Sequence, residues 1–287
     1  MRRIFLIAFF FECWSLSIVN AQSDITNKEI VYQQSENYLP RIITKTYKKT
    51  LDQDSLILRV YHPRLNNKKK FPAIIFVFGY PDSMTYRDYQ KNLQDFGQYT
   101  SWAELFASEG FVSITYQTQS PSKDLKDLFG FINSNAEKLQ IDVNSIGIWS
   151  CSANVPIAIW GLSEKLDLKI KAAALYYGIM PFGDDAIKEE IVEFSKNVGF
   201  EYLPIDSTFK PSALFFIVRA GKDHELINRS IDNFVKKAVV SNYSMTFINN
   251  SEGIHAFDIL QDTTMSKQII RQTITFMKFH LFEPQNE

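Results

Sequence analysis

The feature that most constrains the fold of this chain is a continuous apolar segment, residues 72–78, that stops at the sequence Gly79-Tyr80-Pro81-Asp82. A strand that is buried on both faces is apolar throughout, whereas a strand with one face in water alternates apolar and polar residues. Glycine and proline directly after the segment are typical of a turn. The segment therefore predicts a central strand of a parallel sheet that is covered on both faces.

The rest of the chain alternates between strand-like and helix-like patterns. Two segments with alternating apolar and polar residues, 42–47 and 55–61, come first and predict an antiparallel pair at one edge. Further strands are predicted at 111–116, 145–149, 171–177, 213–218 and 244–248, and helices at 102–109, 123–139, 155–162, 231–240 and 266–282. This order predicts an α/β fold with a mostly parallel central sheet and helices on both faces.

The first residues have the pattern of a signal peptide. Arg2 and Arg3 form a basic start, residues 4–19 form an apolar run in which only Glu12 is charged, and a small-residue cleavage pattern precedes position 22. We predict a signal peptide over 1–21 and export of the mature protein to the periplasm or the medium, with no stable membrane insertion after cleavage. A membrane anchor is the alternative, although the apolar run is short for a span and contains a charge.

The remaining residues, 22–287, are predicted to form one domain, because about 265 residues suit a single large α/β unit. Residues 180–212 form a mixed connection that we consider a candidate small lid. Cys151 is the one cysteine beyond the predicted signal peptide, so an intramolecular disulfide is excluded for the mature chain. The net charge of −1, without a basic stripe, argues against nucleic-acid binding.

The strongest local motif is Ser150-Cys151-Ser152-Ala153-Asn154, which lies between the strand 145–149 and the helix 155–162. A serine hydrolase presents its nucleophile at such a strand-turn-helix, usually as G-x-S-x-G. The motif departs from that pattern at both glycine positions. Cys151 is an alternative nucleophile, but that register places Trp149 at a crowded flank, so Ser152 is favoured. Taken alone, Ser152 also fits a helix-capping role.

A base and a carboxylate follow in the order that this kind of sheet requires, with the acid before the histidine. Asp223 follows the strand 213–218, and His255 follows the strand 244–248. Both therefore belong at the carboxyl ends of parallel strands, the edge where such sheets place their chemistry. We expect Ser152, His255 and Asp223 to form a catalytic triad.

The roles follow from proton affinities. A serine hydroxyl becomes a good nucleophile when an imidazole accepts its proton, and a carboxylate stabilises the resulting imidazolium and orients the ring. The oxyanion of the tetrahedral intermediate needs backbone donors from the residue after the nucleophile and from the loop after the third strand. We predict the backbone N–H groups of Ala153 and Tyr80 for this oxyanion hole.

Four segments resemble secreted α/β-hydrolases related to dienelactone hydrolases and acyl esterases. They are 60–63, 147–152, 219–223 and 253–258, and the resemblance extends over about 41–281. It implies the α/β-hydrolase fold and hydrolysis of a carboxylic ester or lactone through an acyl-enzyme, without a metal ion or organic cofactor. Dienelactone hydrolases carry cysteine as the nucleophile, so their substrate does not carry over to Ser152. Export suggests a small-molecule or polymer-derived ester.

Three other functions stay open at this point. A serine peptidase or an acyltransferase would use the same fold and the same three residues. A hydrolase fold kept as a non-catalytic binding protein is favoured only by the altered glycine positions, and the complete Ser, Asp and His set argues against it.

Overall fold

The computed structural model of the protein describes residues 25–32, 38–49, 55–64, 70–163, 168–183, 185–203, 205, 209 and 211–282. The predicted signal peptide, residues 1–21, lies outside these ranges. Among the helices of the described ranges, none combines the length and the apolar character that crossing a membrane requires.

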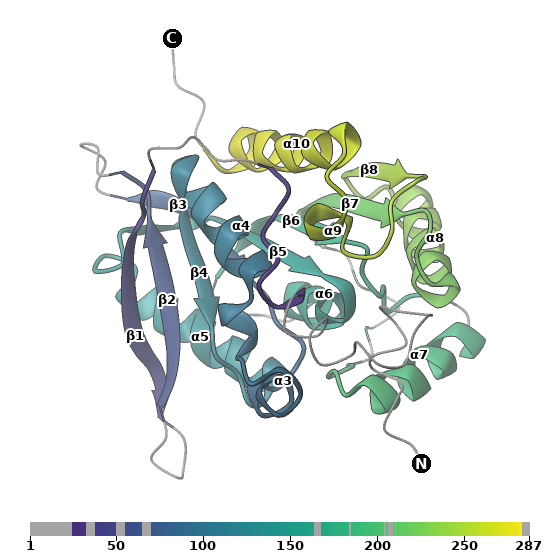
Figure 1. The fold of residues 1–287 in the computed structure, drawn as a ribbon, viewed down its shortest axis with the longest axis horizontal. Helices are drawn as coiled ribbons and strands as arrows, with labels where there is room; N and C mark the ends of the chain where they lie inside the picture. Colours follow the sequence, from purple (N-terminus) through teal and green to yellow (C-terminus); the bar gives the residue numbers. More distant parts are fainter. Residues whose placement is uncertain are drawn as a thin grey trace.

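The centre of the molecule is an eight-stranded sheet with the order β1-β2-β4-β3-β5-β6-β7-β8 (Figure 1). The strands are β1 (Arg41–Lys49), β2 (Ser55–His62), β3 (Phe71–Phe76), β4 (Val112–Tyr116), β5 (Ile141–Cys151), β6 (Ile170–Tyr176), β7 (Leu214–Ala220) and β8 (Met245–Asn250). β2 pairs antiparallel with both β1 and β4, and every other neighbouring pair is parallel. The predicted antiparallel edge and parallel centre are thus confirmed.

The helices of the described chain are α3 (Asp82–Tyr89), α4 (Gly97–Ser108), α5 (Pro121–Asn135), α6 (Val155–Ser163), α7 (Asp185–Val198), α8 (Glu225–Val240), α9 (Phe257–Leu260) and α10 (Thr264–Leu281), with 3-10 turns η1 (Leu93–Asp95) and η2 (Ser152–Asn154). Both faces of the sheet are covered, as predicted. Trp102 of α4 packs against Trp149 on one face, whereas Phe234 of α8 packs against Phe215 on the other.

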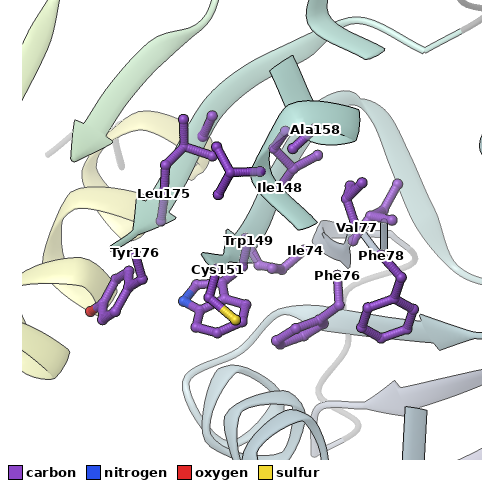
Figure 2. Close-up of a cluster of buried hydrophobic side chains, with 14 of the residues drawn as sticks. Ile74, Phe76, Val77, Phe78, Ile148, Trp149, Cys151, Ala158, Leu175 and Tyr176 are labelled. Atoms are coloured by element: carbon purple, nitrogen blue, oxygen red, sulfur yellow. The ribbon is translucent and has the colours of Figure 1, made fainter. Parts of the chain in front are cut away.

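Alternation along β5 and β6 sorts the core side chains between these two faces. In Figure 2, Trp149 and Tyr176 point to one side of the sheet, and Ile148 and Leu175 point to the other, toward Ala158. All five side chains are at most 2% exposed. The aromatic face lies against α4, where large rings meet at centroid distances of 5.2–5.6 Å. This packing holds the end of β5, which contains Trp149, against α4.

Three helices were not predicted from the sequence. The polar stretch between positions 80 and 101, for which no helix was predicted, contains α3 and the first residues of α4. Of the α3 residues only Asp82 and Thr85 are buried, so no apolar stripe revealed that helix. The connection 180–212 contains α7, and α9 has only four residues. β5 also begins at Ile141, four residues before the predicted strand.

His62, at the end of β2, makes the stability of the fold sensitive to acid. Its side chain is buried, and neither ring nitrogen has a hydrogen-bond partner within the described part of the chain. Burial, aided by the positive charge of Arg41, lowers the pKa of His62 to about 4. The folded protein therefore keeps this ring neutral in a pH range where the unfolded chain protonates it.

We expect the free energy of unfolding to fall as the pH decreases from about 6.5 to about 4, and His62 to contribute about 3 kcal/mol of that loss. Below the lower value the loss is complete, because both states then carry the proton. His62→Phe should reduce this difference, as measured by urea unfolding at neutral and acidic pH. An unchanged pH dependence in the variant would refute the assignment.

Candidate active site

Ser152 lies at the turn between β5 and the helix that follows it. β5 ends at Cys151, η2 begins at Ser152, and α6 begins at Val155. Ser152 has a φ of 56°, in the left-handed region that residues with a side chain rarely occupy. A nucleophile elbow holds its serine in a strained turn of this kind, so that the hydroxyl stands clear of the sheet. The backbone therefore places Ser152, and not Cys151, at the tip of the turn.

The tight packing around this turn uses glycines that lie outside the motif. A Cβ atom on Gly79 would lie 2.8 Å from the carbonyl oxygen of Ala153 and 3.0 Å from Asn154 Cα. A Cβ atom on Gly178 would lie 2.3 Å from a methyl carbon of Val155. Since only glycine permits such close approach, the neighbouring loops supply the space that G-x-S-x-G usually supplies itself.

Cys151, the alternative nucleophile, is buried below the turn, with its sulfur 3.5 Å from the hydroxyl oxygen of Tyr99. Burial raises the pKa of Cys151 to about 12. The thiol is therefore protonated near neutral pH, whereas the thiolate is the nucleophilic form. Together with the position of Ser152 in the turn, this protonation state argues for the serine.

The turns after β7 and β8 carry Asp223 and His255, and the two turns touch. The backbone N–H of Gly221 donates to the carbonyl of Asn250 at 2.7 Å. A Cβ atom on Gly221 would lie 2.4 Å from the carbonyl oxygen of Ser251, so a larger residue would push the turns apart. The glycine thus brings the acidic turn and the histidine turn to the same edge of the sheet.

The structure brings the three predicted residues into a continuous hydrogen-bonded chain. Ser152 Oγ lies 2.9 Å from His255 Nε2, and His255 Nδ1 lies 2.7 Å from Asp223 Oδ2. The other carboxylate oxygen, Asp223 Oδ1, accepts a hydrogen bond from the backbone N–H of His224 at 2.7 Å. The side chains of His255 and Asp223 are 12% and 2% exposed, so solvent has little access to their contact.

This arrangement determines which nitrogen of His255 can act as a base. An ionised carboxylate only accepts hydrogen bonds, so Nδ1 must carry the proton that faces Asp223. In the neutral ring Nε2 then has a free lone pair, and it faces the Ser152 hydroxyl at 2.9 Å. The geometry permits transfer of the serine proton to Nε2, with the resulting positive charge next to Asp223.

A buried hydrogen-bond network around Asp258 packs against His255 through Tyr177. It was not predicted from the sequence. The ring of Tyr177 lies 4.8 Å from that of His255, and its hydroxyl donates to Asp258 at 2.6 Å. Gln98 and Trp102 donate to the other oxygen of Asp258, each at 2.9 Å. Burial raises the pKa of the Asp258 carboxyl, although these donors oppose the shift. The only sequence signal was the position of Asp258, three residues after the histidine.

Tyr80 and Ala153, the predicted oxyanion donors, both line the cavity that contains Ser152 and His255. Ala153 lies in η2 directly after the serine. Tyr80 follows Gly79, and a Cβ atom on Gly79 would lie within 2.8 Å of the Ala153 carbonyl oxygen. The two backbone segments therefore adjoin each other at the cavity that Ser152 also lines.

The cavity next to Ser152 has a volume of about 140 Å³ and a mostly apolar wall. Met84 and Tyr89 come from α3, Tyr99 from α4, and Phe194 and Val198 from α7. Since α7 lies within the segment 180–212, the candidate lid forms part of this wall. Within the described ranges, no group of three or more His, Cys, Asp or Glu side chains is arranged to hold a metal ion.

No protein-family model matches the chain, and no curated protein is similar to it in sequence. Solved structures do resemble it. The apo form of Thermogutta terrifontis esterase 2 has a TM-score of 0.65 at 17% identity, covering 88% of this chain and 100% of the esterase. The esterase LipW from Mycobacterium marinum has a TM-score of 0.62 at 11% identity, covering 85% of this chain and 83% of LipW.

A third similar structure is MGS-M1, an α/β hydrolase enzyme from a Medee basin deep-sea metagenome library. Its TM-score is 0.61 at 14% identity, and the match covers 84% of this chain and 98% of MGS-M1. The sheet order, the helices on both faces and these matches together show the α/β-hydrolase fold that was predicted. At such low identity the likeness extends to the fold alone.

Proposed function

We propose that this chain is a serine hydrolase that cleaves a carboxylic ester through an acyl-enzyme intermediate. The observation that carries the proposal is the hydrogen-bonded chain from Ser152 through His255 to Asp223. Three side chains from distant loops reach this geometry around a serine held at a positive φ, beside an apolar cavity. That combination serves acyl transfer, and it has no comparable use as a capping or packing arrangement.

In the first half of the proposed reaction, Ser152 Oγ attacks the ester carbonyl while His255 Nε2 takes the hydroxyl proton. The new bond joins Oγ to the carbonyl carbon, and the carbonyl oxygen becomes an oxyanion that Tyr80 and Ala153 N–H groups stabilise. Collapse of this intermediate breaks the bond to the alcohol oxygen, and Nε2 returns the proton to that oxygen. An alcohol leaves, and the acyl group stays on Ser152.

In the second half, a water molecule attacks the acyl carbon while Nε2 accepts one of its protons. The bond to Ser152 Oγ then breaks, Oγ recovers a proton from Nε2, and a carboxylic acid is released. Asp223 keeps its negative charge throughout and stabilises the imidazolium in both halves. Every proton is carried by His255, so the cycle closes without a metal ion or cofactor.

We propose a short acyl group for the substrate. The cavity of about 140 Å³ is smaller than the roughly 300–1,000 Å³ of sites for drug-sized ligands, and its wall is apolar. Structures of Thermogutta terrifontis esterase 2 have been solved with propionate and with butyrate bound. Those acids have the size that the cavity of this chain suits.

We also propose that the mature protein is exported and acts on a small-molecule or polymer-derived ester. Its support is the basic and apolar pattern of residues 1–21. The resemblance to dienelactone hydrolases and acyl esterases is part of the same proposal. It is supported by the segments around Ser152, Asp223 and His255 and by the likeness of the fold to esterases.

Two measurements test the proposed function. A fluorophosphonate probe should label the protein once, at Ser152, because such probes react with activated serines; esterase 2 of Thermogutta terrifontis has been solved phosphonylated by sarin. A series of p-nitrophenyl esters should show the highest kcat/KM for acetate to butyrate and a decline for longer chains. Absence of labelling would refute an active serine. Preferred cleavage of peptides would indicate a peptidase, and transfer of the acyl group to an alcohol in preference to water would indicate an acyltransferase.

A further inference from the structure

The two residues that replace the usual glycines of the elbow both contact the loop after β3. Ser150 Oγ donates to the carbonyl of Val77 at 3.1 Å. Asn154 Oδ1 accepts a hydrogen bond from the backbone N–H of Gly79 at 2.7 Å. Glycine has no side chain that could make either bond. Each of the two residues that depart from G-x-S-x-G therefore makes a hydrogen bond between the elbow and this loop.

These two hydrogen bonds are part of a set that satisfies most of the backbone N–H and C=O groups of residues 77–79. The N–H of Val77 donates to the carbonyl of Trp149 at 3.0 Å, and the N–H of Phe78 donates to the Tyr116 hydroxyl at 3.3 Å. The carbonyl of Gly79 accepts from the N–H of Glu201 at 2.8 Å. These hydrogen bonds restrain the loop, and its next residue is Tyr80, the proposed oxyanion donor.

Asn154 is itself held in place from a second side. Its Nδ2 donates to the Tyr99 hydroxyl at 2.9 Å, and the residue is 2% exposed. The amide thus uses its oxygen toward Gly79 and its nitrogen toward α4. A buried amide with both ends satisfied keeps a defined orientation, so it can transmit the position of the elbow to the loop.

We propose that Ser150 and Asn154 are positioning residues, which lock the loop 77–79 to the nucleophile elbow and so fix the Tyr80 N–H for the oxyanion. This inference rests on the proposed esterase function. Gly79 provides the close approach of the loop to the elbow, so positions 150 and 154 of the elbow can carry side chains that form hydrogen bonds. The oxyanion hole is then preorganised by side chains in place of a glycine-rich loop.

The test uses Asn154→Gly, which restores the usual residue of the motif, and Ser150→Ala. Loss of one oxyanion donor lowers kcat by about 100–1,000-fold, so loosening a donor should cost about 10–100-fold for Asn154→Gly and less for Ser150→Ala. KM should change by less than about threefold, because ground-state binding uses the apolar cavity. Affinity for a trifluoromethyl ketone, which forms an oxyanion on Ser152, should fall in parallel with kcat.

Thr273→Ala is the matched control, since it removes a buried hydroxyl that bonds the Ile269 carbonyl and Tyr176 away from the cavity. It should lower thermal stability and leave kcat and ketone affinity unchanged. An Asn154→Gly variant with wild-type or higher kcat would overturn the positioning role. An equal loss of kcat in Thr273→Ala would also overturn it, because the losses would then reflect stability alone. Failure of the proposed function is distinct, because the wild type itself would then show no turnover and no probe labelling.

Discussion

Ser152→Ala is expected to lower kcat for p-nitrophenyl ester hydrolysis by about four to six orders of magnitude, the loss that follows when the nucleophile of a catalytic triad is removed. The reason is chemical, because alanine has no atom that can form the proposed acyl-enzyme, while the cavity and the proposed oxyanion donors stay in place. KM for the residual activity should change little. The measurement is steady-state kinetics on protein whose folding has been checked by circular dichroism.

Cys151→Ser is the matched comparison for that variant. The Cys151 thiol is buried, and its pKa is raised to about 12, so its removal should leave most of the activity and all of the probe labelling. Labelling should disappear in Ser152→Ala. The opposite pattern, with activity lost in Cys151→Ser and kept in Ser152→Ala, would make the cysteine the nucleophile.

Asp223→Asn is expected to lower kcat by about 10⁴-fold, the loss that follows when the acidic member of a triad becomes an amide. The Asn side chain can present its NH₂ group to His255 Nδ1, which would move the ring proton to Nε2 and remove the base that faces Ser152. It would also leave the imidazolium without a neighbouring negative charge. Because the contact is 2.7 Å and only 2% exposed at Asp223, water cannot readily replace the carboxylate.

Asp232→Asn provides the control for this effect. Asp232 lies in α8 and pairs with Arg219 of β7 at 2.9 Å, but its carboxylate is 56% exposed and belongs to no part of the proposed triad. Its removal should leave kcat within about twofold, because exposed ion pairs contribute little to stability or orientation. If Asp223→Asn behaved like Asp232→Asn, Asp223 would not be the residue that orients His255.

Most of the sheet was predictable because its signals are local. The apolar run at 72–78 and the alternating segments at 42–47 and 55–61 gave the right strand types, and chain order placed Asp223 and His255 at the same edge as Ser152. The polar helix α3 lacked any such signal. It packs only a small part of its surface on the core, so its residues show no periodicity that distinguishes them from a loop.

The local pattern along the chain was enough to predict the antiparallel edge and the parallel centre of the sheet, the α/β class and the three residues proposed for catalysis, because burial on two faces and the position of strand ends are properties of short segments. The order of the strands in the sheet came only from the structure. The contacts of Asn154 with Gly79, of Tyr177 with Asp258 and of α7 with the cavity depend on which distant side chains meet. Such contacts between residues far apart in the sequence are determined by tertiary packing. A motif that looked defective in sequence therefore became, once folded, a set of hydrogen bonds to the neighbouring loop.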